Sequence, residues 1–182
     1  MAKLQSDGLI LEIKFSSFED EWINYDVKFY WKEDIIVNDN ILKRTPKGWS
    51  RRSYGTFLAN DYGKDDLIEI IKKVLNSNKP ECWEPMEPDA KVAIYPRRFF
   101  PFLETPYNLF EEMEEIRIED EKRGKSPDDL FTIIAFVDSY NFKNCGAYSG
   151  QGISLHIIVE RKDLEKFLVD LEIEYDNLIK SK

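Results

Sequence analysis

The chain has few of the residues from which catalytic and metal sites are usually built. Its 182 residues include two cysteines, Cys82 and Cys145, and a single histidine, His156. Because the cysteines form no CxxC pair, neither a disulfide framework nor a structural zinc site has support. One histidine excludes a multi-histidine metal centre and must serve any histidine-dependent triad. We therefore expect no metal and no cofactor, and a binding protein more than an enzyme.

The sequence also lacks long apolar runs and an excess of basic residues. Runs such as residues 133–137 are far shorter than the roughly 20 residues that span a bilayer. The first seven residues lack the apolar core of a secretory signal. The net charge of −9 disfavours nucleic acid and anionic membranes, which are bound through surplus Lys and Arg. We expect a cytoplasmic protein with neither partner, and the richness in Ile, Lys, Asn and Glu suggests a bacterial source.

The hydrophobic content is that of a folded domain. Hydrophobic residues make up 42% of the chain and aromatic residues 14%, which is enough for a sizeable core. Residues 1–182 are expected to form a single domain, because no repeat, low-complexity tract or linker interrupts them. The oligomeric state stays open.

Strand patterns dominate the N-terminal third. From Ile23 to Trp31, apolar side chains at 23, 25, 27, 29 and 31 alternate with Asn24, Asp26, Lys28 and Tyr30, which predicts a half-buried strand. Residues 9–15 and 35–42 predict strands on either side of it, and residues 49–58 a further strand after a basic loop. This third is therefore expected to be an antiparallel meander.

Helical patterns follow. Residues 65–76 carry a broad apolar stripe that ends before Pro80, which predicts a helix. A proline-rich passage with a short strand at 91–95 comes next. Thr105-Pro106 is typical of a helix start, so residues 106–122 predict a second helix, although 116–119 fit a strand equally well.

The last third predicts a hairpin and a helix. Residues 130–137 and 153–160 are strand-like and are joined by a glycine-bearing turn, and residues 162–180 have apolar side chains at helical spacing. Together the patterns predict an α+β fold with a mostly antiparallel sheet and about three helices, the last one C-terminal.

The charge is divided into blocks. Residues 104–129 hold ten carboxylates against four basic side chains, whereas residues 43–52 hold five basic residues and no acid. The acidic block is either a surface that docks a basic protein or the solvated side of an amphipathic helix, and it could also pair with the basic loop. The residues predicted to bind a partner are Glu111, Glu112, Glu114, Glu115, Glu119 and Asp120.

An alternative site lies in residues 138–156, where hydroxyl, amide and aromatic side chains gather in a loop and the strand after it. By alternation, His156 shares a face with Ser154 and Ile158, and the turn could bring Cys145 near it. A small-molecule enzyme or ligand-binding protein could use this region, with Asp138, Tyr140, Tyr148 and His156 around one pocket. Plain turn chemistry explains the glycines equally well.

The C-terminal quarter also carries a family resemblance. Asp138-Ser139-Tyr140, a short glycine loop, the strand Gly152 to Val159 and the helix start Arg161 to Phe167 resemble a hairpin-plus-helix ending. That ending is seen in uncharacterised proteins and in immunity proteins of bacterial polymorphic toxin systems, including the WapI-like group. The resemblance implies a small acidic protein that binds and neutralises a basic toxin domain. The expected function is therefore a non-enzymatic acidic protein that docks a basic protein partner, with a toxin-neutralising immunity protein as its most specific form.

Overall fold

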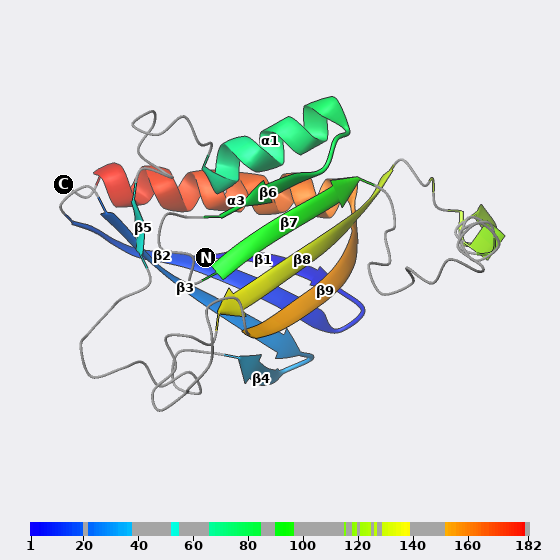
Figure 1. Ribbon diagram of the computed structural model, residues 1–182, viewed down its shortest axis with the longest axis horizontal. Coiled ribbons are helices and arrows are strands. Elements are labelled where there is room, and N and C mark those ends of the chain that lie inside the picture. Colours follow the sequence, from blue (N-terminus) through cyan, green and yellow to red (C-terminus); the bar gives the residue numbers. More distant parts are fainter. Residues whose placement is uncertain are drawn as a thin grey trace.

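The computed structural model describes residues 1–19, 22–37, 52–54, 66–84, 90–96, 115, 118–119, 121–124, 126, 129–138 and 152–180. These residues form an α+β fold with two antiparallel sheets and two delimited helices (Figure 1). The N-terminal sheet contains β1 (Ala2–Ser6), β2 (Leu9–Glu19), β3 (Trp22–Trp31), β4 (Asp34–Val37) and β5 (Arg52–Tyr54). The C-terminal sheet contains β6 (Glu81–Trp83), β7 (Ala90–Pro96), β8 (Leu130–Asp138) and β9 (Gly152–Glu160). The helices are α1 (Leu67–Ser77) and α3 (Arg161–Lys180).

Short turns set the order of the N-terminal sheet, β1-β2-β3-β4, with β5 also paired to β3. Asp7 and Gly8 both have positive φ, 48° and 87°, which suits a two-residue hairpin turn with the right-handed twist of its strands. The register of β2 on β3 shifts between Phe15 and Ser17. At this bulge the backbone N–H of Phe15 donates to Glu174 Oε2 of α3 at 3.2 Å, so the helix satisfies a group at the irregular site of the ladder.

The C-terminal sheet is a simple meander, β6-β7-β8-β9. Gly152 opens β9 opposite Asp138. A Cβ built at Gly152 would lie 1.9 Å from the carbonyl oxygen of Val137, so only glycine fits where the two strands approach.

Both helices bury one apolar face. Asp66 caps α1 by accepting the backbone N–H of Glu69 at 2.8 Å, and the helix ends at Asn78, which is left-handed with φ 52°. In α3, Leu164, Phe167 and Leu171 are buried at spacings of three and four.

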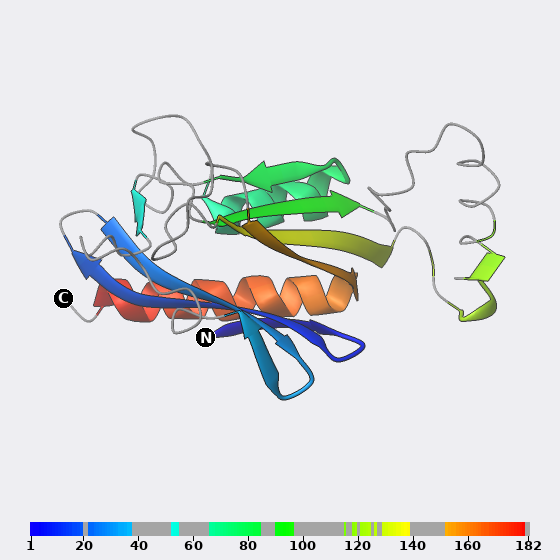
Figure 2. The ribbon, with the colours of Figure 1, turned by 60° about the horizontal axis from the view of Figure 1, so that its bottom comes forward.

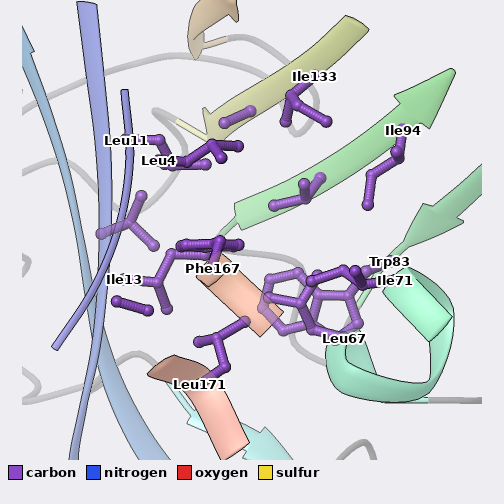
Figure 3. Close-up of a cluster of buried hydrophobic side chains, with 14 of the residues drawn as sticks. Leu4, Leu11, Ile13, Leu67, Ile71, Trp83, Ile94, Ile133, Phe167 and Leu171 are labelled. Carbon is purple, nitrogen blue, oxygen red and sulfur yellow. The ribbon is translucent and has the colours of Figure 1, made fainter. Parts of the chain in front are cut away.

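The helix α3 lies between the two sheets (Figure 2), and α1 packs against α3, β6 and β7. On the side away from the helices, β1 of one sheet approaches β9 of the other. Both sheets therefore contribute to one hydrophobic cluster, in which Phe167 stands between Leu11 and Ile13 on one side and Trp83 on the other (Figure 3). Trp83 also meets Tyr25 edge to face, with ring centroids 5.6 Å apart.

Most predicted elements are present. Strands occur at 9–15, 23–31, 91–95, 130–137 and 153–160, and helices at 65–76 and 162–180, each within a few residues of the expected bounds. Two expectations need correction. The strands form two sheets where one was expected, and two helices are delimited in the described ranges against the expected three. The strands β1 and β6 were not predicted.

The predicted helix 106–122 lies mainly outside the described residues. Within it Glu115, Ile118, Glu119, Glu121 and Lys122 are helical, which excludes the strand alternative at Ile118 and Glu119. None of the helices in the described part of the chain is long and apolar enough to cross a membrane.

Candidate functional site

The structure separates the predicted ligand-binding residues that it describes. Asp138 of β8 lies opposite Gly152, and His156 of β9 lies opposite Ile134, so both point to the outer face of the C-terminal sheet. They are four residues apart along the strands, roughly 13 Å, and therefore do not form a catalytic pair. Tyr140, Tyr148 and Cys145 lie outside the described residues.

This outer face is partly covered. Thr132 and Asp138 are only 1% and 5% exposed, and His156 is half-buried. Burial lowers the pKa of His156 below the ordinary value for histidine, because the charged imidazolium loses hydration. The neutral imidazole is therefore the form that the fold favours near neutral pH.

The described cysteine does not complete a nucleophilic pair with the histidine. Cys82, Ala93, Ile134 and His156 lie in one row across the sheet, so Cys82 and His156 are three strand spacings apart, about 14 Å. Burial and the nearby Glu84 raise the pKa of the Cys82 thiol, which keeps it protonated and weakly nucleophilic. Among the described residues, no three His, Cys, Asp or Glu side chains are grouped closely enough to hold a metal ion.

Only two of the six predicted partner-binding carboxylates are described. Glu115 and Glu119 are on helical residues, and the described pieces of this segment lie to one side of both sheets (Figures 1 and 2). Glu119 Oε1 is 2.5 Å from Arg123 Nη2 one helical turn later, so part of its charge is neutralised locally. Glu111, Glu112, Glu114 and Asp120 lie outside the described residues, and their role stays a prediction.

A different surface emerges at the end of the N-terminal sheet, where the β3–β4 hairpin reaches beyond the helices (Figure 2). Trp31, Ile35 and Ile36 are 46%, 44% and 45% exposed there. The alternation of β3 placed Trp31 on the buried side together with Phe29, and this expectation is wrong, since Phe29 is buried and Trp31 is not. The register shift between Phe29 and Tyr30 accompanies the change, and it leaves Ile36 outside the regular pairing of β4.

Charged residues lie beside these three side chains at the same end of the sheet. We call the whole set the hairpin end (Trp31, Ile35 and Ile36 with Asp7, Lys32, Glu33 and Asp34). Since Trp31 pairs with Asp34 and Ile35 with Tyr30, Trp31 and Ile35 lie on opposite faces of the hairpin. The backbone N–H of Lys32 donates to the carbonyl oxygen of Gly8 at 2.5 Å, which joins the β3–β4 turn to the β1–β2 turn. Asp7, Glu33 and Asp34 are all exposed. Within the described ranges none of these three carboxylates forms an ion pair, while Lys32 Nζ lies 5.8 Å from the centre of the Trp31 ring.

In the middle of the same sheet, by contrast, a carboxylate is paired with basic side chains. Glu12 lies between Lys3 and Lys28 on neighbouring strands, and each lysine Nζ is 3.1 Å from a carboxylate oxygen. The hydroxyl of Tyr30 donates to Glu12 Oε2 at 3.0 Å. Burial alone would raise the pKa of Glu12, but hydrogen bonds from Lys28, Lys3 and Tyr30 outweigh it and lower the pKa. We call these four residues the Glu12 cluster, and its one carboxylate has all its partners within the cluster.

A shallow depression of about 420 Å³ lies beside the C-terminal half of α1 and is lined in part by Lys72, Lys73 and Lys79. Lys72 Nζ is already 3.0 Å from both Glu69 and Glu172. The carbonyl end of a helix also disfavours anions. This depression is therefore a poor anion site despite its lysines.

Comparisons of the chain with models of known protein families, with curated proteins and with solved structures find no match. A functional site at the hairpin end is therefore supported by its geometry and charge.

Proposed function

We propose that this chain is a non-enzymatic binding protein that docks a basic protein partner at the hairpin end. The observation that carries the proposal is the exposure of three large apolar side chains at one end of the hairpin. Trp31, Ile35 and Ile36 are each nearly half exposed, beside carboxylates without ion pairs in the described ranges. Exposed apolar groups with a polar rim are typical of protein interaction sites, and tryptophan is enriched among the residues that dominate binding energy. A rim of three carboxylates and one lysine favours a basic partner.

The rest of the charge supports the same partner. A net charge of −9 raises the local concentration of a cationic protein and speeds its encounter. The acidic segment 104–129, with Glu111, Glu112, Glu114, Glu115, Glu119 and Asp120, supplies a second region that attracts it. The carboxylates thus speed the encounter with the partner, and the apolar side chains of the hairpin end hold the bound partner.

The most specific form of the proposal is a cytoplasmic immunity protein that neutralises a basic toxin domain. Its support is the acidity of the chain and the resemblance of the C-terminal hairpin and helix to such proteins. Neutralisation requires no chemistry from this chain, because covering the basic surface with which a nuclease holds its substrate is sufficient.

The test begins with capture from a lysate of the cells that make the protein, at about 0.05 M and about 0.5 M salt. The retained protein is identified, purified and titrated against the wild type, Trp31→Ala and the control Ile173→Ser, which removes a similarly exposed apolar group on α3. We expect a basic partner whose binding weakens with salt, about 30-fold weaker for Trp31→Ala and unchanged for the control. Failure to retain any basic protein contradicts the function, whereas equal affinity of Trp31→Ala contradicts the site.

The immunity form has its own assay. The identified partner is expressed with and without this chain, and its toxicity and nuclease activity are measured. Suppression by the wild type and not by Trp31→Ala supports immunity, and a partner whose activity is unaffected removes this form while leaving the binding function intact.

A second candidate function, ligand binding or catalysis at the outer face of the C-terminal sheet, is favoured by the burial of Asp138 on that face. Screening small molecules by thermal shift, with Asp138→Asn and His156→Gln as comparisons, tests it. A ligand whose stabilisation both variants retain does not use this face.

A further inference from the structure

A second exposed apolar group lies on α3. Val169 and Ile173 are 50% and 54% exposed, and they lie one turn apart on the side opposite Leu164, Phe167 and Leu171. Solvent-facing helix surfaces are normally polar, so an apolar pair at the middle of this face needs a reason. The pair belongs to a line of six exposed residues that recur at spacings of four and three. We call it the α3 stripe: Lys162, Lys166, Val169, Ile173, Asp176 and Lys180.

The α3 stripe is complementary to itself when reversed. Val169 and Ile173 are equally distant from residue 171, and so are Lys166 and Asp176. A second copy of α3, antiparallel and related by a two-fold axis at residue 171, therefore brings Val169 onto Ile173 of the second copy. The same operation brings Lys166 to the level of Asp176 of the second copy, and it does so twice in each dimer. We propose that α3 is a contact through which two copies of this chain associate.

The charges of the α3 stripe select this orientation. A parallel pair would place each residue against itself, with Lys166 facing Lys166, which is repulsive. In the antiparallel pair the unfavourable contact is Lys162 against Lys180 at the ends. Those lysines already have carboxylate partners, because Lys162 Nζ is 2.6 Å from Glu160 and Lys180 Nζ is 3.1 Å from Asp176. Between the two copies, the Val169–Ile173 and Lys166–Asp176 contacts are therefore favourable. The repulsion between Lys162 and Lys180 is reduced by their carboxylate partners.

The α3 stripe does not suit the basic partner proposed above. Each of its three lysines is paired with a carboxylate of the same chain, so it presents no excess of negative charge to attract a cationic protein. The hairpin end has the opposite property, because its acidic rim would repel a second copy of itself. The self-association of α3 is therefore independent of the proposed function and leaves the hairpin end accessible.

The contact is small. Two helices about 30 Å long bury less than the roughly 800 Å² per partner of a stable protein interface. The association is expected to be reversible and seen only at high concentration, with a dissociation constant between about 10 μM and about 1 mM.

Sedimentation equilibrium from about 10 μM to about 3 mM tests the proposal. The wild type is expected to shift from monomer to dimer across this range, and Ile173→Asp to remain a monomer. Val169→Ser is a milder variant that is expected to weaken association at least about threefold. The matched control is Ile35→Asp, which makes the same change at a similarly exposed isoleucine of the hairpin end and should dimerise like the wild type. A wild type that stays monomeric throughout, or an Ile173→Asp variant that dimerises equally well, overturns the proposal.

Charge reversal tests the antiparallel geometry. Lys166→Glu and Asp176→Lys should each weaken the dimer about tenfold, because each places like charges across the interface twice. The double variant restores opposite charges between copies and should recover most of the wild-type association. It does not restore the pairs within the helix, Lys166 with Asp170 at 2.7 Å and Asp176 with Lys180, so circular dichroism separates loss of helix stability from loss of association. A double variant as weak as the two singles would overturn the antiparallel arrangement.

Discussion

The Glu12 cluster and the hairpin end lie on the same sheet and use charge in opposite ways. In the Glu12 cluster one buried carboxylate meets two lysines and a tyrosine hydroxyl, all within 3.1 Å. At the hairpin end Asp7, Glu33 and Asp34 are exposed beside apolar side chains that are themselves half exposed. Each region contains what the other lacks: the first has charge partners, and the second has unburied apolar surface.

The contrast separates charge that holds the fold from charge that is available to a partner. A desolvated carboxylate with three donors is costly to disturb, because removing it leaves its cations facing one another. Exposed carboxylates contribute little to stability and act mainly on encounter rate and salt dependence. Net charge alone does not make this distinction, and a count of acidic residues overstates how many are free to bind.

The largest expected effect is on stability at the Glu12 cluster. Glu12→Ala should lower the free energy of unfolding by about 2 kcal/mol, because a buried carboxylate with three hydrogen bonds is lost and the partly exposed Lys3 and Lys28 lose their common partner. Urea unfolding measures the change. Glu33→Ala is the matched control at the hairpin end and should stay within about 0.5 kcal/mol of the wild type. Equal losses of unfolding free energy for Glu12→Ala and Glu33→Ala would show that the two regions do not differ in how much their charge stabilises the fold.

The next effect is on binding at the hairpin end. Ile35→Ser combined with Ile36→Ser should weaken the basic partner about tenfold, since both side chains lose apolar contact area. The same double variant should unfold at nearly the wild-type urea concentration, because both isoleucines are exposed before binding. Titration calorimetry and urea unfolding on one protein preparation compare the two quantities. A double variant that unfolds at a lower urea concentration but binds normally would show that the two isoleucines stabilise the fold and do not contact the partner.

A smaller effect is expected from the acidic rim. Glu33→Lys with Asp34→Lys should reduce the association rate severalfold at low salt and flatten its salt dependence, while the dissociation rate changes less. Stopped-flow or surface-based kinetics at several salt concentrations measures both rates. If the change falls on the dissociation rate, these carboxylates make close contacts with the partner and do not act by steering.

Much of the fold followed from periodicity, and the failures have local causes. Alternation located β3, and apolar spacing located α1 and α3, because each of these elements has one buried face. The strand β1 was missed although Asp7-Gly8, a strong hairpin signal, follows it. The strand β6 has three residues among prolines, and what makes it a strand is its pairing with β7, which no local pattern contains.

The candidate site was harder to predict because it depends on where elements end in space. Trp31 continues the alternation of β3, so the pattern predicts burial, but the β3–β4 hairpin reaches beyond the helices and Trp31 is exposed (Figure 2). The distance between Cys82 and His156 likewise depends on four strands in register, which spacing along the chain does not reveal. The signal that was available for the hairpin end was the position of Trp31 next to the charged turn Lys32-Glu33-Asp34.

The smallest expected effect is a pH dependence that belongs to the Glu12 cluster. The pKa of Glu12 is lower in the folded chain than the 4.5 of an ordinary glutamate, because the hydrogen bonds from Lys28, Lys3 and Tyr30 outweigh burial. The unfolded chain therefore takes up the proton at higher pH, so this contribution to stability is complete above about pH 4.5 and is lost as pH falls through the folded pKa. The difference in unfolding free energy between the wild type and Glu12→Gln should shrink over that interval, and Tyr30→Phe, which removes one donor, should keep most of it. A difference that is constant with pH would mean that the lysines hold the protonated acid as well as the carboxylate, and the Glu12 cluster would then owe its stability to packing rather than to charge.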